Sequence, residues 1–211
     1  MSLNQFRELI DETFYTAGAC SLAPHIVLQE IGHDFKLVNV SFKNHQTEDG
    51  QDFLKINPKG QVPFLITDEG LHLSEGAIIS QYLAEIMQNT HLLPAFGDLK
   101  RYKVLEWMNY ISSELHKSYA PFFQKGFDEA SKDIFREKLL KQYAWVDQQF
   151  ADSENVLGQG FTIADIYLFV VTRWASFINL DLSHLKALQR FMHRMEQHPS
   201  VQKAMKNEGI I

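Results

Sequence analysis

The sequence contains a single cysteine, Cys20, among its 211 residues. One cysteine excludes a disulfide within the chain, so we expect no disulfide framework and a reducing compartment, the cytoplasm. The sequence also lacks an apolar run of membrane-spanning length, and residues 1–12 lack the apolar core of a signal peptide. We therefore expect a protein that neither enters a membrane nor leaves the cell.

Clusters of positive charge are absent as well. Lysine and arginine total 20 against 26 aspartate and glutamate residues, which gives a net charge of −6. A chain of this charge, without a basic run, has no electrostatic footprint for nucleic acid or for an anionic membrane surface. We expect neither as a partner, and we expect no bound metal.

Apolar residues are plentiful enough to bury a large core, because hydrophobic types make up 45% of the chain. Residues 13–92 alternate short β-rich runs with helical ones, whereas residues 98–211 have helical patterns almost throughout. Between them, residues 93–97 contain a proline and a glycine, which end one helix and restart the chain. We predict two domains joined by this linker and preceded by an extension, residues 1–12.

The first domain is predicted to have the order βαβ, helix, ββα. Gly32 fits the C-terminus of the first helix, where glycine adopts a left-handed conformation at little cost, and Ser74 can cap the last helix. The expected strands are residues 13–16, 35–40, 62–67 and 71–73, and the expected helices are residues 21–30, 51–54 and 75–86. This order is typical of a thioredoxin-like domain.

Cys20 lies at the turn between the first strand and the first helix. A helix N-terminus carries partial positive charge and free N–H groups, which favour a thiolate over a thiol. A reactive thiol, with its pKa lowered by about two units from roughly 8.5, is therefore one interpretation. The other is a small buried hydrophobic residue, which is the usual role of a free cysteine.

A polar line is predicted on the helix over residues 101–117. Asn109, Ser113 and His116 are spaced i, i+4 and i+7, which places them on one face of an α-helix. This face either is solvated or meets the loop that carries Cys20. In the second case His116 lies near the thiol, where an imidazole can stabilise a thiolate or move a proton.

Thr162 and Asp165 have the spacing of a capping box, in which each side chain bonds the other residue's backbone N–H. Phe161 and Ile166 occupy the positions of a hydrophobic staple around it. We therefore interpret Asp165 as a structural residue and not as a catalytic acid.

Six segments spread over both domains form one pattern of order and spacing. They are residues 14–23 (FYTAGACSLA), 57–63 (NPKGQVP), 74–76 (SEG), 106–111 (EWMNYI), 114–117 (ELHK) and 161–165 (FTIAD). Together they resemble a bacterial beta-class glutathione transferase, from about Thr13 to Gly209. The resemblance implies a fold with an α/β thioredoxin-like N-terminal domain and an all-α C-terminal domain.

The resemblance also implies a function. It predicts a homodimer that conjugates reduced glutathione, as a co-substrate and without a cofactor, to small hydrophobic electrophiles in detoxification. Cys20 and His116 become the catalytic residues, and Cys20 stabilises or transiently bonds the glutathione sulfur. The residues implied in glutathione binding are Cys20, His45, Val62, Pro63, Ser74, Glu75, Gly76, Asn109, Ser113, Glu114 and His116.

Three of these positions carry specific expectations from the resemblance. Val62–Pro63 matches the place of a cis peptide, whose exposed backbone pairs with the cysteinyl residue of glutathione. Glu75, at the mouth of a helix, is expected to bind the ligand's ammonium group. His45 stands where the family has a lysine for the glycyl carboxylate, and Lys43 is the other candidate for that role.

Two other functions stay open. One is a monothiol glutathione-dependent disulfide reductase or peroxidase, since no second cysteine is present, and the other is a non-catalytic binding protein for hydrophobic ligands. Tyr15 stands where other transferase classes keep a catalytic hydroxyl, but we interpret it as a packed strand aromatic. Candidates for an apolar pocket, each as compatible with a core or interface position, are Tyr119, Phe122, Phe123 and Trp174.

Overall fold

The computed structural model of the protein describes residues 11–158 and 160–211. Most of the predicted extension, residues 1–10, lies outside the described residues. The prediction was wrong for Asp11 and Glu12, which belong to the first strand. Both are paired there: Asp11 lies beside Phe35 of the parallel neighbour, so the strand begins earlier than the apolar run suggested.

The first domain is a five-stranded sheet with the order β3-β2-β1-β4-β5. β2 runs parallel to β1, and β4 and β5 are antiparallel to their neighbours, which is the predicted βαβ, helix, ββα arrangement. The elements are β1 (Asp11–Tyr15), α1 (Leu22–Ile31), β2 (Phe35–Ser41), β3 (Gln46–Thr47), α2 (Phe53–Ile56), β4 (Phe64–Ile66), β5 (His72–Ser74) and α3 (Gly76–Ile86). The short β3 is the one strand that the sequence analysis did not expect.

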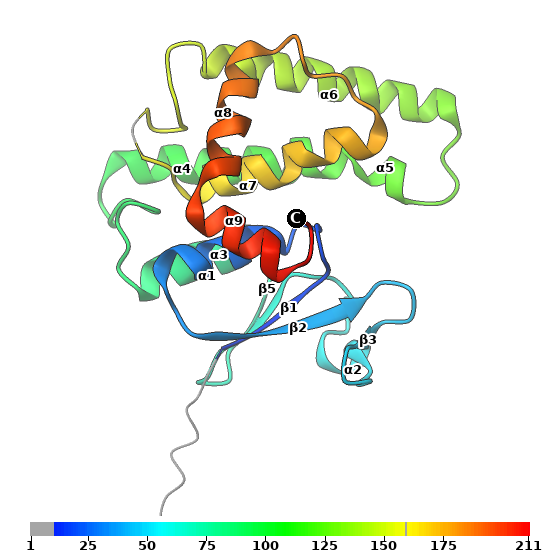
Figure 1. The fold of residues 1–211 in the computed structure, drawn as a ribbon, viewed down its shortest axis with the longest axis vertical. Helices are drawn as coiled ribbons and strands as arrows, with labels where there is room; N and C mark the ends of the chain where they lie inside the picture. The colour runs from blue at the N-terminus through cyan, green and yellow to red at the C-terminus, as the bar shows by residue number, and fades with distance from the viewer. Residues whose placement is uncertain (1–10, 159) are drawn as a thin grey trace, which may run out of the picture.

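The second domain is helical, as predicted. Its elements are α4 (Leu99–Tyr110), a π-helix (Ile111–His116), α5 (Ala120–Phe123), α6 (Glu129–Gln149), α7 (Ile163–Thr172), a 3-10 helix (Arg173–Ile178), α8 (Lys186–Gln197) and α9 (Pro199–Asn207). Figure 1 shows α1 and α3 between the sheet and these helices, and α9 returning to lie along α1. The last helix therefore ties the C-terminal residues to the first domain.

One large apolar core runs through both domains. All residues of α7 are buried, and this helix packs against α1, α3 and α4. A second, smaller core lies between the sheet and α2, where Phe14, Phe53 and Phe64 form a cluster of tilted and edge-on aromatic rings. Burial of a large aromatic side chain contributes about 2 to 3 kcal/mol, so these clusters fix the sheet on its helices.

The predicted capping box begins α7. The Thr162 backbone N–H and hydroxyl both donate to Asp165 Oδ2, at 2.8 and 2.7 Å, and the Val156 N–H donates to Oδ1 at 2.8 Å. Burial raises the pKa of Asp165 to about 6 in spite of these donors. The carboxylate is enclosed by backbone, which is the structural role that the spacing indicated.

Ser74 does not cap α3, contrary to expectation. It ends β5, opposite Phe64 in the sheet register, and Glu75 is the residue that precedes the helix. Glu75 has a φ of 71°, a left-handed conformation that non-glycine residues seldom adopt. The chain thus turns sharply from the last strand into α3, and strained backbone of this kind is frequent at functional sites.

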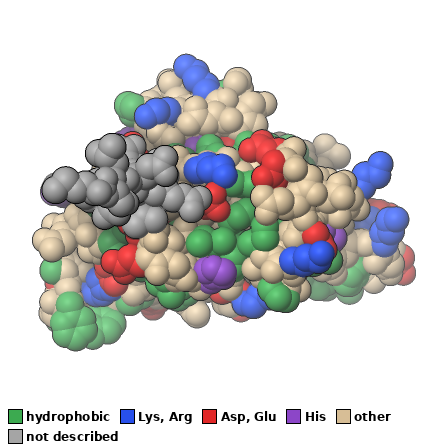
Figure 2. Space-filling view, turned by 90° about the horizontal axis from the view of Figure 1, so that it is seen from below, with side chains coloured by type: hydrophobic (Ala, Val, Ile, Leu, Met, Phe, Trp, Pro, Cys, Tyr) green, Lys and Arg blue, Asp and Glu red, His purple; other side chains and the backbone are tan. Residues whose placement is uncertain are grey.

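Surface charge is mixed on the lower face of the molecule. Figure 2 shows acidic and basic side chains scattered around a central group of hydrophobic ones. Among the helices of residues 11–158 and 160–211, none is long and apolar enough to cross a membrane.

Candidate functional site

The loop between β1 and α1 carries Cys20 and is held by the second domain. The indole N–H of Trp174 donates to the carbonyl of Gly18 at 3.0 Å, and the Gly18 N–H donates to Glu208 Oε2 at 2.9 Å. Gly18 has a φ of 72°, which glycine adopts without strain. Both backbone polar groups of Gly18 are therefore fixed by residues distant in sequence.

Cys20 is a hydrogen-bond donor in this loop. Its Sγ lies 3.3 Å from the carbonyl oxygen of Val62, and Val62–Pro63 is a cis peptide, as predicted. Burial raises the pKa of the Cys20 thiol to about 12. The expected lowering of this pKa is therefore wrong, because the effect of burial outweighs the backbone N–H groups of Cys20 and Ser21, which act to lower it.

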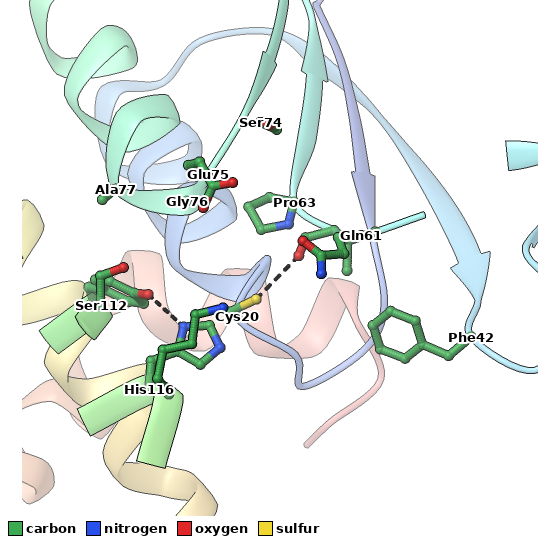
Figure 3. A pocket seen from close by; sticks show the side chains of 13 residues that line it. Cys20, Phe42, Gln61, Pro63, Ser74, Glu75, Gly76, Ala77, Ser112 and His116 are labelled. Atoms are coloured by element: carbon green, nitrogen blue, oxygen red, sulfur yellow. Dashed lines mark hydrogen bonds between the residues drawn. The ribbon is translucent and has the colours of Figure 1, made fainter. Parts of the chain in front are cut away.

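A polar cavity of about 220 Å³ opens beside this thiol (Figure 3). Among the predicted residues, those that line it are Cys20, Val62, Pro63, Ser74, Glu75, Gly76 and His116. Sequence reasoning missed the other lining residues, which are Phe42, Gln61, Ala77, Ser112, Lys117 and Tyr167. Gln61 and Lys117 belong to the motifs over residues 57–63 and 114–117. The sequence pattern gives no indication of a functional role for Tyr167, because it lies within the apolar run of a buried helix.

Glu75 already has a cationic partner at the edge of this cavity. The Lys59 ammonium lies 3.2 Å from Glu75 Oε1 and donates to the Ser74 hydroxyl at 2.9 Å. Both side chains of the ion pair are more than half exposed, so its contribution to stability is under about 1 kcal/mol. A ligand ammonium group can replace Lys59 at little cost.

Neither candidate for the glycyl carboxylate reaches the cavity. His45 and Lys43 are absent from its described lining, where Phe42 is the residue contributed by this segment. His45 has a φ of 52°, and its ring lies against Gly60, where a Cβ would meet ring atoms at 3.2 Å. The turn after β2 directs the His45 ring toward the loop over residues 57–61, and its role in binding the glycyl carboxylate stays a prediction.

The predicted polar face of Asn109, Ser113 and His116 does not form. Residues Ile111–His116 are a π-helix, in which hydrogen bonds span five residues and the side chains rotate less per residue than in an α-helix. Ser112 and His116 therefore share the cavity face, while Asn109 and Ser113 are exposed elsewhere. Glu114 turns to α6, where its carboxylate lies 3.1 Å from the ammonium of Lys138.

His116 is a neutral imidazole in this structure. Burial lowers its pKa to about 4, Lys117 lowers it further, and Glu75 opposes the shift. Its Nδ1 lies 2.6 Å from the hydroxyl of Tyr167. The expected proximity to Cys20 holds, since both residues line the same cavity.

A second, apolar cavity of about 430 Å³ adjoins the first. The two share Cys20, Phe42, His116 and Lys117 as lining residues. Its other walls are Thr16, Ala17, Gly18, Ala19, Tyr119, Ala120, Phe123, Trp174 and Phe177. Three of the four apolar candidates, Tyr119, Phe123 and Trp174, therefore line this cavity. The fourth, Phe122, lies under the guanidinium of Arg136.

Tyr15 has the packing role that we preferred. It is 8% exposed in β1 and does not line either cavity among the described residues. Burial raises its pKa above the usual value, although a hydrogen bond with Asn39 opposes this. Within residues 11–158 and 160–211, no group of three or more metal-ligating side chains is assembled.

The two cavities together define a class of protein. An extended peptide can pair with the edge beside the cis Val62–Pro63 bond, and a carboxylate and helix N–H groups at Glu75 and Gly76 suit the zwitterionic end of an amino acid. An apolar cavity meets this site at Cys20. The arrangement suits a short zwitterionic peptide beside a hydrophobic second ligand.

The chain belongs to the glutathione S-transferase family. Models of the N-terminal and C-terminal domains of glutathione S-transferases match residues 13–85 and 96–199. The chain is 45% identical to glutathione S-transferase GstA of Escherichia coli O157:H7 over 197 residues, covering 93% of this chain and 98% of that protein.

Solved structures agree with this assignment. A sphingomonad glutathione S-transferase in complex with glutathione is 37% identical, with a TM-score of 0.91, and the match covers 95% of this chain and 100% of that one. The bacterial beta class glutathione S-transferase of Sphingomonas chungbukensis is 36% identical, with the same TM-score and the same coverage. The predicted family and fold are confirmed.

Proposed function

We propose that the protein conjugates reduced glutathione to small hydrophobic electrophiles, with glutathione in the polar cavity and the electrophile in the apolar one. The observation that carries this proposal is that the two cavities share Cys20, Phe42, His116 and Lys117. A sulfur atom held at that boundary faces the second substrate, and fixed proximity of two reactants supplies a large part of a rate enhancement.

Each end of glutathione has a partner in the polar cavity. The carboxylate of Glu75 binds the γ-glutamyl ammonium in place of Lys59. The first N–H groups of α3, at Gly76 and Ala77, bind the γ-glutamyl carboxylate, because a helix N-terminus favours an anion. The backbone of Val62 pairs with the cysteinyl residue, which directs the ligand's sulfur to Cys20.

In this proposal Cys20 is a hydrogen-bond donor and not the nucleophile. A thiol with a pKa of about 12 stays protonated at neutral pH and can donate to the thiolate of glutathione. The glutathione thiol releases its proton to solvent, and the thiolate then attacks the electrophilic carbon. The new C–S bond forms as the leaving group, such as chloride, departs with its electron pair.

The test compares wild type with Cys20→Ala in conjugation of a chlorinated nitroaromatic and in glutathione-dependent disulfide exchange. We expect the variant to bind glutathione and to lose about 10- to 100-fold in conjugation, because a hydrogen bond to a charged group contributes about 1.5 to 3 kcal/mol. Full activity of the variant in both assays would contradict the role of Cys20. Wild-type turnover in disulfide exchange alone would favour the monothiol reductase, and glutathione binding without turnover would favour a binding protein.

We also propose a homodimer formed through α3 and α4. Large apolar side chains are exposed on these helices and on the linker between them: Ile78 on α3 is 51% exposed, Leu99 and Tyr102 on α4 are 79% and 60% exposed, and Phe96 in the linker is 92% exposed. An exposed apolar group of this size on a globular protein indicates an interface, and a second copy of the chain is its occupant. Leu99→Glu should shift the species measured by analytical ultracentrifugation from dimer to monomer, whereas a monomeric wild type would contradict the proposal.

The dimer gives a role to residues that the polar cavity does not use. Asn109 and Ser113 are exposed at the junction of α4 and the π-helix, and Glu114 follows them. We place these three among the residues that approach glutathione bound to the partner subunit. The proposed location is the cytoplasm, where reducing conditions keep Cys20 a free thiol.

A further inference from the structure

A chain of hydroxyl groups leads from the π-helix to His116. Tyr167, on α7, is 3% exposed, and its hydroxyl oxygen lies 2.6 Å from His116 Nδ1. Ser112, on the same helix as His116, lies close enough to the Tyr167 hydroxyl to lower the pKa of that phenol. All three residues line the polar cavity, and Figure 3 shows His116 and Ser112 together below Glu75.

The direction of the hydrogen bond between Tyr167 and His116 follows from its length and from what each group can donate. Burial raises the pKa of Tyr167 well above its usual value, so its O–H proton is present at neutral pH. The distance of 2.6 Å is shorter than the usual range for a bond donated by N–H to oxygen, about 2.7 to 3.2 Å, and the phenolic O–H is a more acidic donor than a neutral imidazole N–H. Tyr167 therefore donates to His116 Nδ1.

This direction decides which ring nitrogen of His116 carries the proton. Because burial keeps the imidazole neutral, one nitrogen accepts and the other donates. Nδ1 accepts from Tyr167, so the proton is on Nε2. In Figure 3 the second ring nitrogen of His116 lies on the side of Cys20.

The other groups around the imidazole act in opposite directions, and the ring stays neutral on balance. Lys117, next to it on the chain, opposes a positive charge on the ring, and Glu75 on α3 favours one. Trp174 packs edge-on to the ring, with centroids 4.9 Å apart. Cys20, the remaining facing group, is a protonated thiol and adds no charge. The ring is therefore held between an apolar wall and a single hydroxyl donor.

We propose that Tyr167 is a positioning residue, whose hydroxyl holds His116 as the Nε2–H tautomer so that the imidazole donates to the glutathione sulfur. The inference rests on the proposed function, in which that sulfur lies beside Cys20. It assigns His116 the role of a hydrogen-bond donor to the thiolate. The alternative is a general base, which needs an unprotonated nitrogen on the cavity side.

The first test compares Tyr167→Phe with Tyr143→Phe. Tyr143 is a matched control, because it is also buried and its hydroxyl lies 2.9 Å from another hydroxyl, that of Tyr119. We expect Tyr167→Phe to lower kcat for conjugation about 10-fold with KM for glutathione within about twofold, because the ring loses its fixed orientation. Tyr143→Phe should lose similar thermal stability and keep kcat within about twofold.

The second test reads the tautomer directly by ¹⁵N NMR of the imidazole. In the wild type at pH 7, Nδ1 of His116 should have the ¹⁵N chemical shift of an unprotonated ring nitrogen, and Nε2 should have that of a protonated one. Tyr167→Phe should give averaged shifts, which indicate a mixture of tautomers. Ser112→Ala should change kcat and the shifts in the same direction by a smaller amount.

The outcomes separate this inference from the proposed function. If the wild type does not conjugate glutathione, the proposed function is wrong. If the wild type is active and His116→Ala keeps wild-type kcat, the role of His116 as a donor to the sulfur is wrong. If His116→Ala is impaired but Tyr167→Phe keeps kcat, or if the Tyr167→Phe shifts equal those of wild type, only the positioning role is overturned. In the His116→Ala background, Tyr167→Phe should have no further effect on kcat, since the two residues act as a unit.

Discussion

Trp174 and Gly18 are joined by a hydrogen bond of 3.0 Å from the indole N–H to the loop carbonyl. Trp174 is also a wall of the apolar cavity, and its ring packs edge-on to His116. One side chain of the second domain therefore shapes the electrophile cavity and fixes the loop that carries Cys20. The position of the thiol depends on the docking of the two domains and not on the loop alone.

Loss of Glu208 should weaken this docking. Its carboxylate accepts from the Gly18 N–H and lies 2.9 Å from Nδ1 of His25, and both side chains of the His25–Glu208 pair are fully buried. Glu208→Ala leaves two buried groups without partners, so we expect the free energy of unfolding to fall by about 3 kcal/mol. Urea denaturation measures this change.

The control is Glu137→Ala, which removes an exposed carboxylate of α6 and should change the free energy of unfolding by less than about 0.5 kcal/mol. Equal unfolding midpoints for wild type and Glu208→Ala would contradict a structural role for the buried pair.

The Cys20 thiol should react slowly with iodoacetamide at neutral pH. Its pKa of about 12 leaves little thiolate, so the alkylation rate of the ligand-free protein should rise about tenfold per pH unit from pH 7 to 10. Mass spectrometry at each pH gives the rate, and Cys20→Ser provides the baseline without a thiol. An alkylation rate that reaches a plateau below pH 8 would indicate that Cys20 is a thiolate at neutral pH. Cys20 would then be a nucleophile and not a hydrogen-bond donor.

His116 should make the protein less stable in acid. The fold lowers its pKa from 6.5 to about 4, so its contribution is fully present above pH 6.5 and is lost as the pH falls through 4. This difference in the His116 pKa between the unfolded and folded states corresponds to at most about 3 kcal/mol in the free energy of unfolding. The measurement is the free energy of unfolding at pH 7 and at pH 4. It should fall between these two pH values in wild type, and the fall in His116→Asn should be smaller by about 2 to 3 kcal/mol. Equal falls in the two proteins would contradict a lowered pKa of His116.

Lys59→Met should tighten glutathione binding. Lys59 holds Glu75 in the ligand-free protein, so its removal leaves the carboxylate open to the ligand's ammonium, with an expected decrease in Kd of about two- to fivefold. Isothermal titration calorimetry measures this, and the exposed Lys55→Met on α2 is the control for lost positive charge. Weaker binding by Lys59→Met alone would mean that Lys59 instead contacts a carboxylate of the ligand.

Several parts of the fold could be predicted because their causes are local. Gly32 ends α1 with a φ of 66°, and the Thr162–Asp165 box begins α7, since capping needs only neighbouring backbone groups. The β-rich and helical runs indicated the order of the elements along the first domain. The start of β1 was misjudged because Asp11 is polar, and its place is decided by partners from other elements: it pairs with Phe35, and its carboxylate accepts from the Asp68 N–H.

The site was predicted less completely, for reasons that are not local. Regular α-helical spacing placed Asn109, Ser113 and His116 on one face, but the π-helix rotates Ser112 into the cavity instead. A turn with a positive φ at His45 moved that side chain to Gly60. A hydrogen bond between distant segments, such as that from Tyr167 to His116, has no periodic signal in the chain.

By itself, the sequence determined the family, the two domains and the approximate place of one thiol, because spacing along the chain dictates caps, strands and turns. The tertiary structure decided the state of that thiol. Enclosure beside Val62 raises the pKa of Cys20, and burial against Trp174 keeps His116 neutral. The charge of an ionisable group depends on the solvent and the charges around it, and only packing brings those groups together.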